Sequence, residues 1–217
     1  MSTKFFDNES GNTLFNKLKG IACEMATFDR FLAVVGFFRS SGYFKLRKEL
    51  GDISEIKILV GINIDDIFRK HNKALLMLAN DEKAKEIYHS AFKQDIVNAQ
   101  YSPEVEEGIL QMCEDLVSGR LQMRIHATKN LHAKFYLCLP KKHNEHSDGW
   151  VIMGSSNISD SGLGIKQPQQ HELNVAMKDF DDVKYCSDEF ETLWKEAVPI
   201  TADDIDNYKK KTYLGYQ

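Results

Sequence analysis

The sequence predicts an α/β fold, with a mixed, largely parallel β-sheet that is flanked by helices on both faces. Two short apolar runs rich in β-branched and aromatic residues, Arg30–Phe38 and Glu55–Ile62, are typical of buried strands. Between them, the amphipathic segment Ser41–Leu50 ends at Gly51, as a helix often does. This strand–helix–strand order predicts a parallel pair of strands joined by a right-handed crossover.

The remaining elements follow the same rules of periodicity, and the 217 residues suffice for one sizeable domain. Further helices are expected at Thr13–Met25, Ala74–Ala79, Ala84–Phe92, Pro103–Leu116 and Val183–Ala197. Further strands are expected at Leu121–His126, Ala133–Leu139, Gly149–Met153 and Glu172–Met177.

The composition, 42% apolar and 28% charged, is ordinary for a globular protein. The longest apolar runs are strand-sized, far below the ~18 residues that a membrane span needs. Residues 1–10 are polar and acidic rather than signal-like, so we expect a cytoplasmic protein. The four cysteines lack C-x-x-C spacing, which argues against a zinc site and against a disulfide framework.

The net charge of −4 conceals a basic segment in an otherwise acidic chain. Residues 120–170 carry seven Lys or Arg against three Asp or Glu, and acidic residues are concentrated after Asp179. Local charge matters more than total charge for binding a phosphodiester, so this segment favours a phosphate ligand. Lys141 and Lys142 are equally typical of a solvated loop.

His132 and Lys134 stand two apart in an apolar run and are the first candidate site residues. Their spacing predicts that both side chains leave the same face of the expected strand. A buried lysine without a counter-charge is costly, and a bound phosphate would supply that charge. Taken alone, an H-x-K pattern is weak, since a single strand histidine is more often a hydrogen-bonded core residue.

A second polar group, Gly154-Ser155-Ser156-Asn157, follows the next expected strand. Backbone N–H groups and small polar side chains in such a turn can close around an anion. The same residue types also favour turns for conformational reasons alone. Because neighbouring strands deliver their ends to one edge of a sheet, we expect this turn to meet the H-x-K pair.

Two further positions can be interpreted either as functional or as purely structural. Glu172 could accept a hydrogen bond from the His132 ring and fix its tautomer, or it is an exposed carboxylate at a strand end. Arg39, after the first strand, could contact a phosphate while Phe38 stacks on a base. The alternative is a surface arginine with Phe38 in the core.

This combination resembles the phospholipase D-like superfamily, whose signature is H-x-K followed by G-S-x-N. The matching residues are His132-Ala133-Lys134 and Gly154-Ser155-Ser156-Asn157, and Glu172 matches the glutamate that follows in nuclease members. The chain looks most like members with one copy of the motif. These are small bacterial endonucleases, the catalytic domain of a metal-independent type IIS restriction enzyme, and domains that precede helicase modules.

One position departs from the fuller family motif, which has Asp five residues after the Lys, where this chain has Leu139. Loss of that Asp is familiar among restriction-type and helicase-linked members, and it leaves phospholipase activity without support. The chain also shows no amphipathic basic helix or apolar lid suited to a membrane surface, so no membrane partner is expected.

The resemblance implies a metal-independent phosphodiesterase that needs no cofactor and acts on nucleic acid through a phosphohistidine. DNA is expected more than RNA as the partner, although the sequence does not distinguish the two. The residues expected to be catalytic are His132, Lys134, Asn157 and Glu172. The residues expected to bind substrate are Ser155, Ser156 and Arg39. The alternative is a non-catalytic nucleic-acid-binding module of a helicase or restriction system.

The resemblance also implies an assembly, because a second histidine must protonate the leaving oxygen and this chain has one H-x-K. Single-motif members dimerise so that two motifs meet at a two-fold axis, and we expect such a homodimer here. His126 and His171 are the competitors within the chain. Residues 1–198 are expected to form the phosphodiesterase domain, with 199–217 as a tail or linker toward a helicase-type module of a longer protein.

Overall fold

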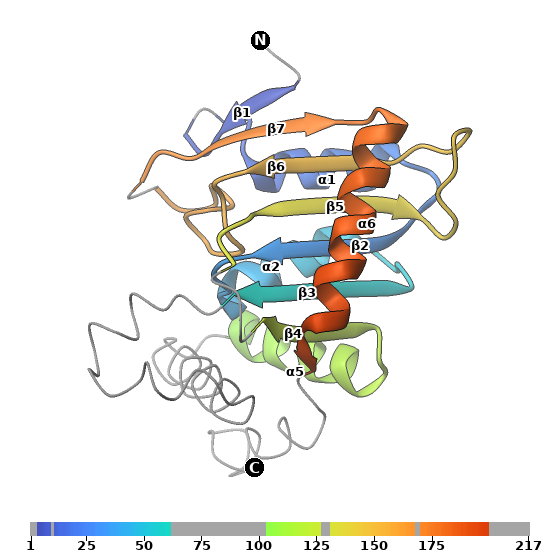
Figure 1. The fold of residues 1–217 in the computed structure, drawn as a ribbon. Helices are drawn as coiled ribbons and strands as arrows, with labels where there is room; N and C mark the ends of the chain where they lie inside the picture. Colours follow the sequence, from blue (N-terminus) through green and yellow to red (C-terminus); the bar gives the residue numbers. More distant parts are fainter. Residues whose placement is uncertain (1–3, 10, 62–102, 127–130, 168–169, 200–217) are drawn as a thin grey trace, which may run out of the picture.

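The computed structural model describes residues 4–9, 11–61, 103–126, 131–167 and 170–199, which build one sheet with helices on both faces (Figure 1). The sheet has eight strands in the order β1-β7-β6-β5-β2-β3-β4-β8. The strands are β1 (Phe5–Asp7), β2 (Phe28–Val35), β3 (Glu55–Gly61), β4 (Leu121–His126), β5 (Phe135–Pro140), β6 (Trp150–Gly154), β7 (Leu173–Met177) and β8 (Val198–Pro199). The described helices are α1 (Leu14–Glu24), α2 (Ser40–Leu50), α5 (Pro103–Val117) and α6 (Phe180–Glu196).

The sheet is mixed, but the expectation that it is largely parallel was wrong. Only β2–β3 and β3–β4 pair in parallel, and the other described pairs are antiparallel. The parallel part is the predicted β2–α2–β3 crossover together with β4. Residues 141–148 join the end of β5 to the start of β6 without a helix, at the right-hand end of the sheet in Figure 1. A parallel pair needs a longer crossover connection, so strands joined this directly run antiparallel.

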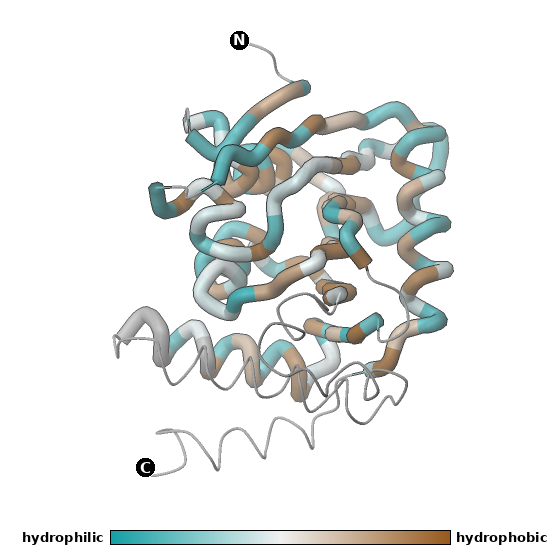
Figure 2. Tube along the Cα trace, turned by 60° about the vertical axis from the view of Figure 1, so that its left-hand side comes forward, coloured by the Kyte–Doolittle hydropathy of each residue, from teal (hydrophilic) through white to brown (hydrophobic). Residues whose placement is uncertain are grey.

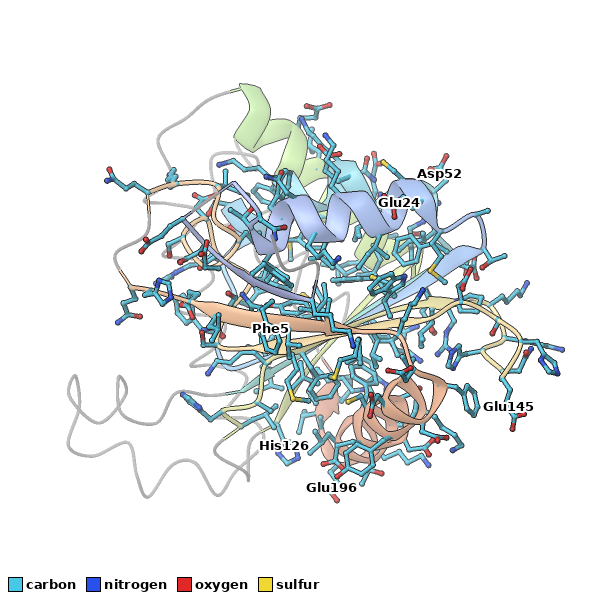
Figure 3. All side chains as sticks on the ribbon, turned by 90° about the horizontal axis from the view of Figure 1, so that it is seen from above. Phe5, Glu24, Asp52, His126, Glu145 and Glu196 are labelled. Carbon is cyan, nitrogen blue, oxygen red and sulfur yellow. The ribbon has the colours of Figure 1, made fainter. Side chains whose placement is uncertain are left out.

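Viewed edge-on, the sheet separates α1, α2 and α5 on one face from α6 on the other (Figure 3). Alternate residues of the strands supply two cores, one beneath each helical layer. Along α6, hydrophobic and hydrophilic stretches alternate (Figure 2), and its inward side buries Val183, Phe190 and Trp194. None of the helices in the described ranges combines the length and apolar character needed to cross a membrane.

Most of the expected elements lie within a few residues of their predicted bounds, and β4 matches its prediction at both ends. The edge strands β1 and β8 were missed, because runs of three and two residues carry no periodic signal. The helices expected at 74–79 and 84–92 lie outside the described residues. Gly51 ends α2 with φ 68°, a left-handed conformation that favours glycine.

A buried ion pair joins α2 to α5. The Arg47 guanidinium donates from Nε to Asp115 Oδ2 over 2.6 Å and from Nη2 to Oδ1 over 3.3 Å. Arg47 also donates from Nη1 to the carbonyl of Gly51 at the end of α2, over 2.8 Å. Two bonds to one carboxylate fix the register between the helices as well as their spacing.

Replacing Arg47 with Met should lower the free energy of unfolding by about 3–5 kcal/mol, because the Asp115 carboxylate then stays buried without its main counter-charge. Urea titration measures the loss, and the double variant Arg47→Met, Asp115→Leu should recover most of it. The control is the exposed pair Lys48–Glu107, 2.9 Å apart, where Lys48→Ala should cost less than about 1 kcal/mol. Equal losses in the two single variants would contradict this account.

Candidate phosphate-binding site

Four polar segments meet at one end of the sheet, the left-hand end in Figure 1. The H-x-K segment leads into β5, the Gly154–Asn157 turn follows β6, Glu172 precedes β7, and residues 36–39 follow β2. Neighbouring strands in this part of the sheet alternate in direction, so strand starts and strand ends lie together at this edge. The prediction that the H-x-K strand and the strand before the turn are neighbours is confirmed.

Lys134 is buried at the centre of this group, with 7% of its surface exposed. Its Nζ donates to the carbonyl of His132 over 2.8 Å, and within the described residues no carboxylate lies at ion-pair distance. Burial lowers the pKa of Lys134, and the charge of Glu172 opposes that shift. Among the described residues, the site thus contains a buried ammonium without a paired anion.

His132 and Lys134 were expected to lie on a strand. They lie just before it, because β5 begins at Phe135. The backbone of residues 131–134 is irregular, and Lys134 Nζ folds back to the His132 carbonyl. His132 is exposed, and its ring forms no hydrogen bond or ion pair with any described residue.

Gly36 lies in contact with both Lys134 and Asn157. A Cβ at this position would lie 3.6 Å from both Lys134 Cε and Asn157 Oδ1, and 3.4 Å from the carbonyl of Leu131. Asn157 Oδ1 accepts a hydrogen bond from the Phe37 N–H over 2.9 Å, which fixes the orientation of the amide. Its Nδ2 forms no hydrogen bond in the described part of the chain, so it remains a donor beside the lysine.

The turn begins at Gly154 because β7 passes too close for a side chain. A Cβ there would lie 2.3 Å from Asn174 Oδ1 and 2.4 Å from the Leu173 carbonyl. At Ser155, the backbone N–H donates to that carbonyl over 3.2 Å, and Oγ accepts from the Leu173 N–H over 3.1 Å. The exposed Ser155 hydroxyl therefore keeps its own proton for another acceptor.

Ser156, which had been expected to bind substrate, is fully buried, and its polar groups support the turn from below. Its hydroxyl accepts a hydrogen bond from Asn174 Nδ2 over 2.9 Å, and its carbonyl accepts one from the Tyr136 hydroxyl over 2.7 Å. Sequence reasoning missed Tyr136 and Asn174. Each could have been found in the sequence as a polar side chain at a core position of an otherwise apolar strand.

Glu172 is half-buried near Lys134, and within the described residues no hydrogen bond joins it to the His132 ring. Its backbone N–H donates to Asn8 Oδ1 over 3.0 Å. Asn8 is 3% exposed, and its Nδ2 donates to the carbonyls of Gln170 over 3.0 Å and Ser161 over 3.3 Å. Asn8, which sequence reasoning also missed, therefore holds the segment that carries Glu172.

The two competing histidines occupy different settings. The ring of His126 at the end of β4 is 0% exposed, with Nε2 3.5 Å from Glu196 Oε2, and both residues lie on the α6 side of the sheet (Figure 3). His171 is largely exposed, and its Nδ1 lies 3.4 Å from Glu9 Oε1. His126 is thus enclosed in the fold, whereas His171 remains accessible beside Glu172.

Of the two interpretations of Phe38, the one that places its side chain in the core is confirmed, and the one that stacks it on a base is not supported. Phe38 is 6% exposed and packs on Tyr43, with ring centroids 5.9 Å apart. Arg39 is half-buried, and its guanidinium lies 4.2 Å from the centroid of the Phe37 ring. Phe37 is therefore the aromatic residue beside the site.

The ammonium, amide and hydroxyl donors at this edge of the sheet, together with the exposed His132, form a candidate site for a phosphate group. Residues 54–194 match the family model for the phospholipase D-like domain of cardiolipin synthase. The chain therefore belongs to the phospholipase D-like family. A comparison with curated protein sequences gives no match.

Solved structures with a similar fold have very different sequences. The archaeal chromatin protein TrmBL2, described as showing a novel mode of DNA binding, is 13% identical with TM-score 0.45, over 92% of this chain and 54% of its own. The phospholipase D family member Nuc of Salmonella typhimurium is 8% identical with TM-score 0.47, over 91% and 97%. Phosphatidylserine synthase of Haemophilus influenzae Rd KW20 is 11% identical with TM-score 0.52, over 91% and 39%. The chain thus spans about half of the chromatin protein and less of the synthase.

Replacing Asn8 with Ala should lower the free energy of unfolding by about 1–3 kcal/mol, because it leaves the buried N–H of Glu172 and two carbonyls without their partner. Asn8→Asp keeps the acceptor but places a buried carboxylate against two carbonyls, so it should destabilise the fold at least as much as Asn8→Ala. Asn16→Ala, at an exposed asparagine of α1, is the control and should change stability by less than about 0.5 kcal/mol. Thermal and urea unfolding measure the stability of all three variants. Equal stability of Asn8→Ala and Asn16→Ala would contradict the role of Asn8 in holding the segment that carries Glu172.

Proposed function

We propose that this chain is a metal-independent phosphodiesterase that cleaves nucleic acid through a phosphohistidine on His132. The observation that carries the proposal is the buried ammonium of Lys134, which has a backbone carbonyl as its partner and no carboxylate at ion-pair distance among the described residues. Arg47, the other buried lysine or arginine of the described residues, is paired with Asp115. Because a buried unpaired charge is costly, Lys134 favours an anionic ligand.

The remaining donors surround the same point. Asn157 Nδ2 and the Ser155 hydroxyl can donate to non-bridging phosphate oxygens together with Lys134, where negative charge builds in the transition state. Arg39 would contact a neighbouring phosphate of the same strand. Glu172 would orient the His132 ring once the ring turns inward from its exposed position.

The chemistry then runs in two displacements. In the first, a ring nitrogen of His132 bonds to phosphorus as the bond from phosphorus to the leaving oxygen breaks, and a second histidine protonates that oxygen. In the second, water bonds to phosphorus and gives a proton to the second histidine, and the bond between phosphorus and nitrogen breaks. The products are a free hydroxyl and a phosphate monoester, and both histidines return to their starting states.

A second copy of the chain would supply the second histidine at a two-fold interface. Three large apolar residues near the site are exposed, Phe5 by 57%, Leu173 by 56% and Met153 by 39%. Met153 and Phe5 both pair with Val175, and Leu173 lies two residues from Val175, so all three share the sheet face that carries α6. This surface adjoins the Gly154–Asn157 turn, so a partner docked on it would bring its own motif to the site.

The proposal extends to the wider protein. DNA is the favoured substrate over RNA, and the phosphodiesterase domain ends near residue 198. Residues 199–217 would then lead toward a helicase-type module, and the domain would act within a helicase or restriction system.

The wild-type protein should cleave DNA oligonucleotides in EDTA and form a phosphohistidine that mass spectrometry detects. His132→Ala should abolish the adduct and slow cleavage by about 10³-fold or more, because no other group can take the phosphoryl. Lys134→Met should also reduce cleavage, through loss of the charge that faces the phosphate. The control is His146→Ala, an exposed histidine of the 141–148 connection at the opposite end of the sheet.

Two outcomes would overturn the enzymatic proposal. DNA binding without any cleavage would identify the non-catalytic module instead. Cleavage that persists in His132→Ala would assign the activity to another group.

Sedimentation velocity should show a dimer for the wild type, and Leu173→Lys should shift it to the monomer, because a charge replaces an apolar contact at the interface. The rate of DNA cleavage by Leu173→Lys should fall in proportion to the loss of dimer. The matched control is Val117→Lys, since Val117 is 65% exposed on α5, on the other face of the sheet. A wild-type monomer that cleaves DNA at the same specific rate across all concentrations would contradict the shared site.

A further inference from the structure

Phe37 is a large aromatic residue that belongs to neither core. Its neighbours Val35 and Phe38 are buried in the core beneath α1, α2 and α5, whereas Phe37 is half-buried and absent from both clusters of packed side chains. Within the described chain its ring contact is with Arg39, at 4.2 Å from the guanidinium to the ring centroid. The packing of the fold therefore does not explain an aromatic side chain here.

The position of Phe37 places this ring beside the candidate phosphate site. Its backbone N–H donates to Asn157 Oδ1 over 2.9 Å. The preceding residue, Gly36, is the position from which a Cβ would lie 3.6 Å from both Asn157 Oδ1 and Lys134 Cε. Since consecutive Cα atoms are ~3.8 Å apart, the Phe37 side chain starts one residue from the groups that would hold the phosphate.

The backbone on both sides of the ring is fixed. The Arg39 N–H donates to the Ile158 carbonyl over 2.8 Å, and Phe38 forms a parallel bridge with Ile158. Together with the bond from Phe37 to Asn157, these contacts tie residues 37–39 to the turn that carries the site. A backbone held in this way, with the ring against Arg39, loses little conformational entropy when the residue contacts a ligand.

We propose that Phe37 and Arg39 form a subsite that stacks an unpaired nucleobase next to the bound phosphate, so that the substrate is single-stranded or locally unpaired nucleic acid. This inference rests on the proposed function. Every nucleobase has a π-face, so stacking on Phe37 would tolerate any sequence. Arg39 adds a cation at the ring, which favours the neighbouring phosphate and the base plane.

The requirement for an unpaired base follows from duplex geometry. In a duplex both faces of each base are covered by its neighbours, and exposing one costs a few kcal/mol of unstacking. A base in a single strand, a flap or a loop offers its face at much lower cost. The subsite would therefore discriminate by strandedness, whereas Lys134 and Asn157 contact a group common to all nucleic acids.

The test uses His132→Ala as a cleavage-free parent and adds Phe37→Ala, Phe37→Leu or Phe37→Trp. The ligands are a single-stranded DNA oligonucleotide containing 2-aminopurine and the blunt duplex of the same sequence. The parent should bind the single strand more tightly and quench the 2-aminopurine fluorescence. Phe37→Ala and Phe37→Leu should weaken single-strand binding about 10- to 100-fold and abolish the quenching, while Phe37→Trp should retain both.

Duplex affinity should change little in these variants, and circular dichroism checks that each is folded. Tyr185→Ala is the control, because Tyr185 is an aromatic residue 70% exposed on α6, and it should bind as the parent does. Phe37→Leu keeps an apolar side chain at this position, so its loss of binding reports stacking and not folding.

The outcomes separate this inference from the proposed function. Single-strand binding that is unchanged in Phe37→Ala and Phe37→Leu, or a preference of the parent for the duplex, would overturn the stacking subsite alone. Absence of any binding to either oligonucleotide would overturn both proposals. Binding that depends on Phe37 in a protein whose wild type does not cleave would support the subsite and overturn the enzymatic proposal.

Discussion

The buried ammonium of Lys134 is the constraint on which the rest of the site depends. Gly61 at the end of β3 makes room for the segment that delivers it, because a Cβ there would lie 2.5 Å from the carbonyl of Leu131. At Gly36, just after β2, a Cβ would lie 3.4 Å from the same atom, which is ordinary contact, so the segment packs closely there without requiring glycine. From this segment Lys134 enters the interior.

The antiparallel half of the sheet converts this buried charge into a site. Because β6 runs opposite to β5 and β7, the end of β6 meets the starts of its two neighbours, and three separate segments of sequence become adjacent. The polar atoms of the turn are then divided by role. Ser156 and the carboxamide of Asn174 bond to each other beneath the turn, whereas Ser155 and Asn157 keep donors on its outer side.

Local sequence pattern could predict the elements, the two motifs and their adjacency, because each depends on periodicity or on residue type. It predicted the direction of the β2–β3 pair, which a helix joins, but it missed that the strands from β5 onward run antiparallel. The sequence also could not show that Phe37, and not Phe38, is the aromatic residue beside the site. The reason is that Gly36 follows the end of β2 and interrupts the alternation that assigns strand residues to the two faces of the sheet. Asn8 contacts Glu172 across 164 positions of sequence, a separation at which local pattern carries no information.

The position of Leu139 explains why loss of the family aspartate is compatible with a complete phosphate site. Leu139 is fully buried in the core beneath α6 and pairs with Arg30 on β2, at the end of β5 away from the motif. Five residues of extended chain separate it from Lys134, which corresponds to ~16 Å. An acidic side chain there would lie too far away to touch a phosphate held by Lys134, and in this core it would be a buried charge. Leucine in place of aspartate at position 139 thus removes no group that would contact the phosphate. The one catalytic group still lacking in the proposed mechanism is a second histidine.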